Sequence, residues 1–223
     1  MSDLVVEVLP DADAVAERGA SYVAEQAQAA IAERGRFTFA VSGGRTPRAM
    51  FSKLVGRVPW ETVAIYQVDE RVAPDGDPDR NLTHLRRSLP PAAAADVRAM
   101  PVGADDLEAA AADYARSLPE RLDLVHLGLG PDGHTASLVP GDPVLDVADR
   151  DVAVTGVYQG RRRMTLTYPA LNRARRVLWL VTGEDKADAL ERLRAGDESI
   201  PAGRVHAESA LVLADAAAAG ETA

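Results

Sequence analysis

Apolar residues follow two different periods along this chain. Compact apolar runs typical of buried strands occur at residues 4–10, 36–41, 63–68, 122–127, 174–183 and 209–215. Between them, apolar residues recur with helical spacing at residues 11–35, 48–56, 81–89, 105–118 and 184–196. One stripe of the first helix holds Val15, Tyr22, Val23, Ala27, Ala30 and Ile31. Residues 151–157 and 162–167 indicate a pair of strands, and residues 69–81 a polar loop.

The alternation of strands and helices predicts an α/β fold. This order is typical of a mostly parallel sheet with helices on both faces. No internal repeat or linker interrupts the pattern, so we expect residues 1–223 to form a single domain. The alanine-rich end, residues 216–223, is expected to fray.

Composition narrows the possible chemistry and the possible partners. The chain has 223 residues, of which 47% are hydrophobic and 26% charged, as in ordinary globular domains. It contains no cysteine, which excludes disulfides, thiolate metal sites and a cysteine nucleophile. The formal net charge of -9 argues against a nucleic-acid-binding surface, so positive charge for an anionic ligand must be local. The sequence has neither a membrane span nor a secretion signal, and we expect a cytoplasmic protein.

Four of the predicted strands end in polar loops. These loops are SGGRTP (42–47), DER (69–71), GPDGHT (130–135) and TGEDK (182–186). In open parallel sheets, ligands bind beyond the carboxyl ends of the strands. The four loops are therefore the candidate site.

The loop SGGRTP follows a strand and opens a helix. Backbone N–H groups at Gly43 and Gly44, together with the Ser42 hydroxyl, form a pocket suited to a phosphate. Thr46 is the expected N-cap, and Pro47 suits the first helical turn. The loop lacks the pattern of a Walker A motif or a dinucleotide fingerprint, so a nucleotide is not expected. On this motif alone, a tight turn that binds nothing is an equal alternative.

Two further loops and one basic run carry charged side chains. Asp69 and Arg71 are predicted to contact substrate, whereas Glu70 fits a salt-bridged loop anchor. Lys186 stands in the first turn of a predicted helix, where the helix dipole opposes a cation, so we expect an anion nearby. Most of the basic run 161–163 is expected to be solvated.

His134 is the best candidate for a general base. It follows a predicted buried strand in a glycine-rich turn, where an imidazole can reach solvent and exchange protons near neutral pH. Asp132, two residues earlier, can orient the ring or contact a substrate hydroxyl. A turn with an ordinary surface histidine is the alternative. His126 and His134 make a poor zinc site, because no third ligand stands at a recognisable spacing.

Taken in order, five segments resemble the 6-phosphogluconolactonases, a family related to the glucosamine-6-phosphate isomerases. They are SGGRTP, DER, GLGPDGHTASLVPG, MTLTYPALNRARRVLWLVTGEDKADAL and IPAGRV. The third segment is the specific one, and the similarity extends to about residue 215. The resemblance implies an open Rossmann-like sheet and no metal or organic cofactor. It also implies that a phosphorylated sugar lactone, 6-phospho-D-glucono-1,5-lactone, is hydrolysed to 6-phosphogluconate in the oxidative pentose phosphate pathway.

The resemblance also implies roles for single residues. His134 matches the family's catalytic histidine, and Asp69 and Asp132 match acidic positions that line the site. Positions associated with sugar-phosphate binding are matched by Ser42, Gly43, Gly44, Arg71, Arg163 and Lys186. A lactone carbonyl needs an activated water and donors for the developing oxyanion. We therefore expect His134 to deprotonate water, and backbone N–H groups after the glycine turns to stabilise the oxyanion.

Two alternatives to the lactonase remain open. The related isomerases, or deaminases, carry a glutamate where this chain has Val139, and valine cannot transfer a proton, which favours the lactonase. The second alternative is a non-catalytic sensor that binds sugar phosphates without consuming them. The segment TGVYQGRRR (155–163) replaces a proline-rich, lysine-containing segment common in the family, which leaves the lid and the role of Arg163 open.

Overall fold

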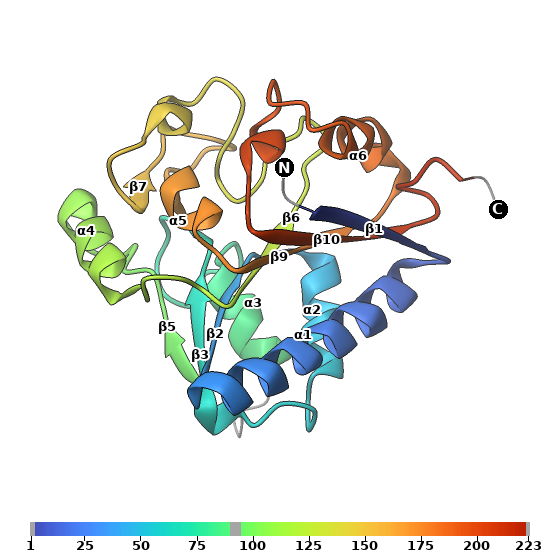
Figure 1. The fold of residues 1–223 in the computed structure, drawn as a ribbon. Helices are drawn as coiled ribbons and strands as arrows, with labels where there is room; N and C mark the ends of the chain where they lie inside the picture. Colours follow the sequence, from blue (N-terminus) through green and yellow to red (C-terminus); the bar gives the residue numbers. More distant parts are fainter. Residues whose placement is uncertain (1–2, 90–94, 222–223) are drawn as a thin grey trace.

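Seven parallel strands form the central sheet in the computed structural model of the chain, which describes residues 3–89 and 95–221 (Figure 1). In spatial order the strands are β1 (Asp3–Leu9), β10 (Ser209–Asp215), β9 (Arg176–Val181), β6 (Leu124–Gly128), β2 (Phe37–Val41), β3 (Val63–Gln67) and β5 (Asp96–Arg98). Each strand pairs in parallel with its neighbours. The predicted α/β class with a mostly parallel sheet is confirmed.

Helices cover both faces of this sheet, as predicted. They are α1 (Ala12–Arg34), α2 (Arg45–Lys53), α3 (Asn81–Ser88), α4 (Leu107–Ser117), α5 (Tyr168–Asn172) and α6 (Ala187–Arg194), with 3₁₀ turns η1 (Trp60–Thr62), η2 (Pro143–Asp146), η3 (Glu184–Lys186) and η4 (Pro201–Arg204). Alternate strand residues face opposite sides, so Phe39 packs with α1 and α2, and its neighbour Ala40 belongs to the core under α4 and α6. In Figure 1, α1 and α2 lie on one side of β9 and β10, and α6 lies on the other. Within the described ranges, no helix is long and apolar enough to cross a membrane.

A second, smaller sheet is antiparallel. It contains β4 (Asp69–Arg71), β8 (Arg163–Leu166) and β7 (Val152–Val154), in that order. The predicted strand pair at 151–157 and 162–167 is confirmed, but the prediction of a loop at 69–71 was wrong. The motif DER has no apolar alternation, and it becomes a strand because β8 supplies a hydrogen-bonding partner. Strand β5 was also missed, because its three residues are all exposed and form no apolar run.

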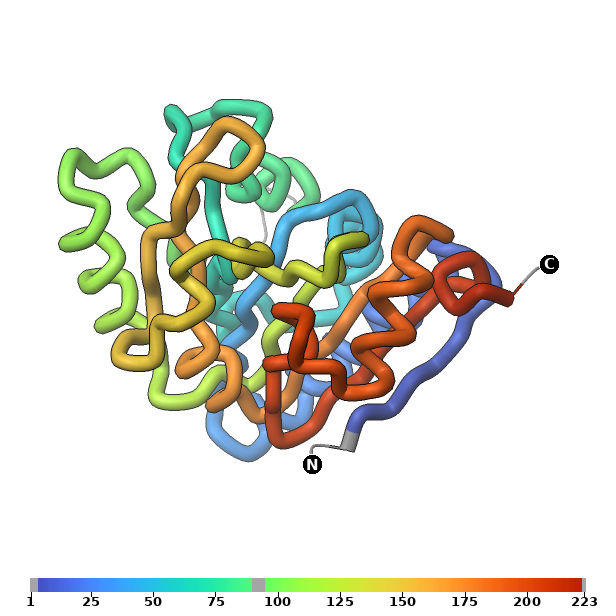
Figure 2. Tube along the Cα trace, turned by 90° about the horizontal axis from the view of Figure 1, so that it is seen from above, coloured from blue at the N-terminus to red at the C-terminus, as the bar shows by residue number. Residues whose placement is uncertain are grey.

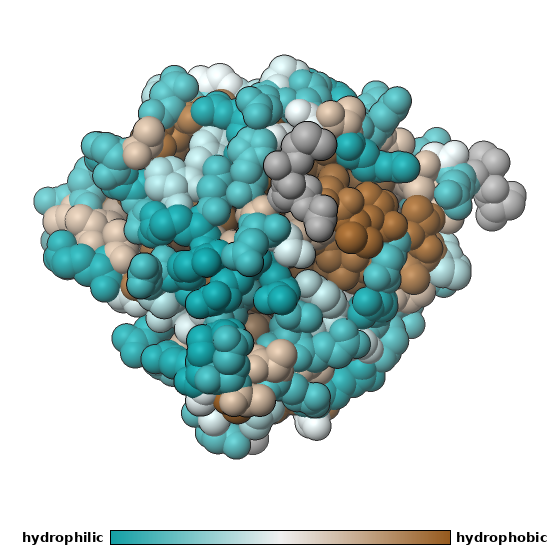
Figure 3. All heavy atoms as spheres, in the orientation of Figure 1, coloured by the Kyte–Doolittle hydropathy of each residue, from teal (hydrophilic) through white to brown (hydrophobic). Residues whose placement is uncertain are grey.

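The two ends of the described chain meet at one edge of the main sheet. Figure 2 shows the blue N-terminal strand beside the red C-terminal segment, which is the pairing of β1 with β10. Val5 and Val8 of β1 are exposed, and Figure 3 shows apolar surface over this strand.

The segment after β10 is folded rather than extended. Ala216 N–H donates to Leu9 O (2.8 Å), residues 216–220 form a turn, and Ala218 is buried. The expectation of a frayed end therefore does not hold for residues 216–220, because the turn packs onto the sheet. Residues 222–223 lie outside those described.

The strand order reverses direction between β2 and β6. From β2 the sheet grows through β3 to β5, whereas from its neighbour β6 it grows the other way through β9 and β10. The connections that follow β2 and β6 therefore leave the sheet in opposite directions. A crevice at the carboxyl ends of two such strands is the usual ligand site of an open α/β sheet.

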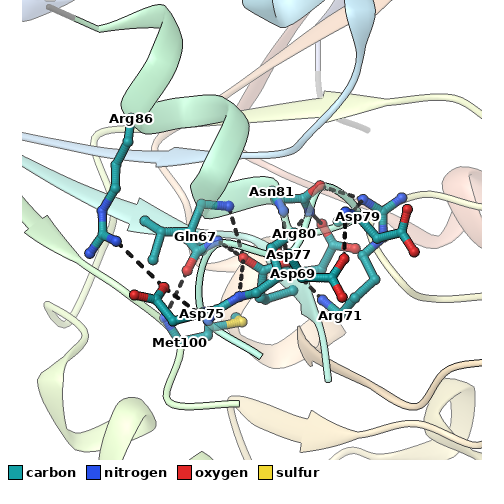
Figure 4. Close-up of polar contacts among 12 residues, drawn as sticks. Gln67, Asp69, Arg71, Asp75, Asp77, Asp79, Arg80, Asn81, Arg86 and Met100 are labelled. Carbon is teal, nitrogen blue, oxygen red and sulfur yellow. Dashed lines mark hydrogen bonds and ion pairs between the residues drawn. The ribbon is translucent and has the colours of Figure 1, made fainter. Parts of the chain in front are cut away.

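A buried carboxylate joins the small sheet to α3. The Glu70 carboxylate is fully buried. It accepts hydrogen bonds from the Gln67 side-chain amide (2.8 Å) and from the backbone N–H groups of Arg71 (2.9 Å), Asn81 (2.8 Å) and Leu82 (2.8 Å). Figure 4 shows the polar contacts around this point, with Gln67, Arg71 and Asn81 labelled. Asn81 begins α3, so this carboxylate satisfies the first donors of the helix and lies at the positive end of its dipole. Arg80 Nε lies 3.5 Å from Glu70, which confirms the interpretation of Glu70 as a salt-bridged anchor.

Replacing Glu70 by glutamine is expected to lower the free energy of unfolding by about 3 kcal/mol, because the amide NH₂ would face N–H donors inside the protein. Urea unfolding of Glu70→Gln beside wild type measures this change. Glu61→Gln is the matched control, since Glu61 is exposed, and it should unfold like wild type. Equal stability of Glu70→Gln and wild type would contradict the anchoring role.

Candidate active site

A pocket of about 310 Å³ opens at the crevice between the carboxyl ends of β2 and β6. All four predicted loops contribute to its wall. The predicted site residues that line it are Ser42, Gly43, Gly44, Asp69, Arg71, His134, Arg163 and Lys186. Asp132 stands outside the lining and contacts His134. The volume is in the range of small-molecule sites.

Gly43 lets Asn81 reach the pocket. A Cβ atom at Gly43 would lie 1.9 Å from Asn81 Oδ1, so any other residue would displace this side chain. Asn81 Oδ1 accepts a hydrogen bond from Arg71 Nη1 (2.7 Å), and Asn81 Nδ2 donates to Asp69 Oδ1 (3.1 Å). Asn81 therefore links the acidic and basic members of the DER motif, as Figure 4 shows.

The helix after SGGRTP begins earlier than predicted. Gly44 is the N-cap of α2 and Arg45 its first residue, so the prediction of Thr46 as N-cap was wrong. Thr46 Oγ1 instead makes a hydrogen bond with Thr182 Oγ1 (2.8 Å). Because Thr182 follows β9, this contact joins two of the four loops. The Thr46 hydroxyl is thus engaged in this bond, although an N-cap at Thr46 would have needed it.

The backbone of Ser42 is hydrogen-bonded to a buried histidine. His126 is fully buried in β6, and burial lowers its pKa to about 3. The neutral ring accepts a hydrogen bond at Nδ1 from Ser42 N–H (3.3 Å). Ser42 Oγ is buried in the pocket wall and has no hydrogen-bond partner among the described residues, so it is available to a ligand.

His134 is oriented by Asp132. Burial alone would raise the pKa of Asp132, but hydrogen bonds from the His134 backbone N–H and ring outweigh it and lower the pKa. The ionised carboxylate can only accept, so the 2.5 Å contact between Asp132 Oδ1 and His134 Nδ1 puts the ring proton on Nδ1. The other nitrogen, Nε2, is left as the acceptor. A Cβ at Gly130 would lie 2.1 Å from His134 Nδ1, so the ring needs glycine beneath it.

Asp69 has partners other than the histidine. Its buried carboxylate accepts hydrogen bonds from Ser137 Oγ (2.6 Å) and from Asn81 Nδ2 (3.1 Å). Of the two acidic residues predicted for the site, Asp132 is thus the one that contacts His134. The N–H of Gly130 donates to His134 O (2.8 Å), which removes this glycine from the expected oxyanion donors.

The basic run 161–163 divides between three environments. Arg161 pairs with Asp77 and Asp79, and Arg162 is exposed, whereas Arg163 is buried and lines the pocket. Burial lowers the pKa of Arg163, as does the charge of Arg71, while Asp69 acts in the opposite direction. An arginine keeps its charge in spite of such a shift. The expectation that most of the run is solvated holds for Arg162, whereas Arg163, which the resemblance placed at the sugar phosphate, is the member that lines the pocket.

Lys186 has an anion beside it within the chain. It is the N-cap residue of α6, and its Nζ lies 2.9 Å from Asp185 Oδ2. The expected anion near this helix start is thus present as a carboxylate. Lys186 still lines the pocket.

The pocket is locally positive in an acidic protein. Its lining contains Arg45, Arg71, Arg163 and Lys186 but only one acidic residue, Asp69, although the chain carries a formal net charge of -9. This arrangement favours an anionic ligand. In the part of the chain that the structure describes, no group of three or more His, Cys, Asp or Glu side chains could hold a metal ion.

Three polar lining residues had no role assigned from the sequence: Arg45, Asn81 and Thr182. Arg45 and Thr182 lie within loops already assigned to the site, so their position was a usable signal. Asn81 lies at the far end of a long polar segment, and tertiary contacts with Glu70, Arg71 and Asp69 hold it at the pocket.

A parallel α/β sheet with a cationic pocket at its switch point is the arrangement typical of domains that bind small anionic ligands. The family described as glucosamine-6-phosphate isomerases/6-phosphogluconolactonase matches residues 10–213. The chain belongs to this family of enzymes.

Relatives and solved structures agree with this assignment. A 6-phosphogluconolactonase of Synechocystis sp. is 36% identical over 227 residues, with 93% of each chain covered. One of Streptomyces coelicolor is 34% identical, with 95% of this chain and 92% of the relative covered. The 6-phosphogluconolactonase structure from Thermotoga maritima matches with a TM-score of 0.85 and 26% identity, covering 96% of this chain and all of that one. A monomeric glucosamine-6-phosphate deaminase shares the fold, with a TM-score of 0.84 and 19% identity over 98% of this chain and 100% of that one.

The neutral state of His126 has a consequence for stability against acid. Below pH 6.5 an unfolded histidine takes up a proton that folded His126 takes up only near pH 3. The free energy of unfolding therefore decreases as the pH is lowered through this window. His126→Asn should remove this contribution, which is up to about 1.4 kcal/mol per pH unit. The loss of unfolding free energy between pH 7 and pH 5, measured by urea unfolding, should be smaller for His126→Asn than for wild type. An equal difference in the two proteins would contradict a buried neutral histidine.

Gly43→Ala is expected to lower the free energy of unfolding by about 1–3 kcal/mol, because its Cβ would displace Asn81 from Arg71 and Asp69. The same change should weaken binding of inorganic phosphate, measured by calorimetry. Gly103→Ala is the matched control, since a Cβ there meets nothing within 4 Å. Equal phosphate affinity in Gly43→Ala and wild type would contradict the role of Asn81 in shaping the pocket.

Proposed function

We propose that this protein hydrolyses 6-phospho-D-glucono-1,5-lactone to 6-phospho-D-gluconate, the lactonase step of the oxidative pentose phosphate pathway. One observation carries the proposal: His134, held by Asp132, borders the same pocket as the cations Arg71, Arg163 and Lys186. The pocket therefore combines a proton acceptor with a site for a charged group. The relatives named 6-phosphogluconolactonase support this reading, since they are matched over nearly their whole length.

The phosphate of the substrate binds at the cationic side of the pocket. Arg71, Arg163 and Lys186 supply the charge, and Arg71 is oriented by Asn81. Ser42 Oγ and the backbone of Gly43 and Gly44 complete the phosphate site at the start of α2. Binding energy from the phosphate then positions the lactone carbon, which lies at the other end of the molecule.

The lactone carbonyl is attacked by water at the His134 side. Asp132 accepts a hydrogen bond from the Nδ1–H group, which leaves Nε2 free to remove a proton from water while the water oxygen bonds to C1. The tetrahedral intermediate collapses by breaking the bond between C1 and the ring oxygen. His134 returns its proton to that oxygen, which leaves the open-chain acid. The carboxylate of Asp69 accepts a hydrogen bond from a sugar hydroxyl in the pocket.

The isomerase or deaminase reading is less well supported. The position at which the related isomerases carry a glutamate is Val139, which is buried outside the pocket lining. A valine can transfer no proton during opening of a sugar ring. Release of ammonia from glucosamine 6-phosphate tests this alternative directly.

The first test is hydrolysis of lactone formed in situ from glucose 6-phosphate, compared with the spontaneous rate. Wild type should accelerate the reaction, and His134→Ala should lower kcat by about 10²- to 10⁴-fold. Binding of 6-phosphogluconate, measured by calorimetry, should be largely retained in His134→Ala because the phosphate contacts remain.

The matched control is His206→Ala. His206 is an exposed histidine that pairs with Glu198 and lies outside the pocket lining, so this variant should hydrolyse lactone at the wild-type rate. Wild-type turnover by His134→Ala would remove the proposed base. Binding of 6-phosphogluconate without acceleration by wild type would indicate a sensor instead of an enzyme.

A further inference from the structure

Tyr158 stands at the tip of the hairpin that joins β7 to β8. Tyr158 N–H donates to Arg161 O (3.0 Å), and Arg161 N–H donates to Tyr158 O (3.2 Å). The two residues between them, Gln159 and Gly160, have φ values of 51° and 78°, as in the tight turns that suit the twist of a hairpin. The backbone at Tyr158 is therefore held by a closed turn.

A second set of contacts holds this hairpin against the rest of the site. Arg161 forms ion pairs with Asp77 and Asp79, in the segment between β4 and α3. Val72 N–H donates to Arg162 O (3.0 Å). The hairpin tip is thus attached on both sides, and the position of its aromatic ring is set by the fold.

The Tyr158 ring contacts two residues of the pocket at once. Its centroid lies 5.8 Å from that of the His134 ring, with the planes at 63° to each other. The Arg163 guanidinium carbon lies 5.0 Å from the same centroid, over the ring. Both geometries are attractive, as an edge contact between rings and a cation–π contact. Tyr158 itself is outside the pocket lining, so it acts on a ligand through its two neighbours.

Arg163 has few other means of orientation. Its Nε is buried with no hydrogen-bond partner among the described residues, and its Nη2 donates to Gln159 Oε1 (3.1 Å) in the same hairpin turn. His134 is held by Asp132 at Nδ1 and by the close approach of Gly130. The Tyr158 ring adds a contact to each, and it is the element that the two share.

We propose that Tyr158 is a positioning residue that holds the His134 imidazole and the Arg163 guanidinium in one fixed arrangement through contacts with its ring. This inference rests on the proposed function, in which His134 serves the lactone carbon and Arg163 the phosphate. The aromatic ring carries the role, and the hydroxyl does not. Loss of the ring therefore affects both ends of the substrate, whereas loss of the hydroxyl affects neither.

The kinetic test compares Tyr158→Leu and Tyr158→Phe with wild type in lactone hydrolysis. Tyr158→Leu should both lower kcat and raise KM, reducing kcat/KM by roughly 5- to 30-fold, as expected for losing one aromatic pair and one cation–π contact. Tyr158→Phe should keep both constants within about twofold of wild type, since it retains these contacts. The matched control is Val157→Ala, at the neighbouring position, where the side chain is 72% exposed, and it should behave like wild type.

Two outcomes would overturn the proposal. One is a folded Tyr158→Leu protein with wild-type kcat and KM. The other is a Tyr158→Phe protein as impaired as Tyr158→Leu, which would assign the role to the hydroxyl. If Tyr158→Leu does not fold, Tyr158→Thr, whose branched side chain suits extended backbone, replaces it with the same expected results.

A measurement without turnover separates this proposal from the proposed function. The His134 C–H proton signals, identified by their loss in His134→Ala, should shift in Tyr158→Leu because the ring current of Tyr158 is removed, and affinity for inorganic phosphate should fall. These two effects are expected even if wild type proves unable to hydrolyse the lactone, which would reject the proposed function alone. Unchanged His134 signals and unchanged phosphate affinity in Tyr158→Leu would reject the role of Tyr158.

Discussion

The buried carboxylate of Glu70 is the interaction on which the geometry of the site depends. A fully buried charge is costly unless every lone pair finds a donor, and here backbone and side-chain N–H groups surround it. Meeting this requirement places the start of α3 against β4. Asn81, Asp69 and Arg71 then meet at the pocket as a consequence of satisfying one acidic group.

Close approach is the second condition of the site. Gly43 leaves room for the Asn81 side chain, and Gly130 leaves room for the His134 ring. A Cβ atom at either glycine would overlap the side chain that packs against it. The glycines that suggested phosphate-binding and turn motifs thus also serve to bring functional side chains against the backbone. Rigid loops of this kind, set at the ends of a parallel sheet, can hold an acid–base group and a cationic cluster at a fixed separation.

Local sequence patterns predicted much of the candidate site. The contact of Asp132 with His134 is between residues two apart in one turn, so short-range geometry was enough to expect it. The edge of the sheet was also predictable, because parallel strands end on the same side. Residue type alone does not separate Arg163 from Arg161 and Arg162. The resemblance singled it out, and the pairing of β8 with β4 sets it opposite Arg71.

The sequence by itself determined the α/β class, the order of its main strands and helices, and the segments that bear the chemistry, because periodicity and motif spacing are local properties of the chain. Only the tertiary structure decided which side chains meet. Asn81 contacts Arg71 although the two are ten positions apart in the sequence, and the Tyr158 ring contacts His134 from the hairpin between β7 and β8. Thr46 bonds to Thr182 in place of capping its own helix. Such contacts depend on how separate segments pack, and no pattern within one segment encodes the distance to another.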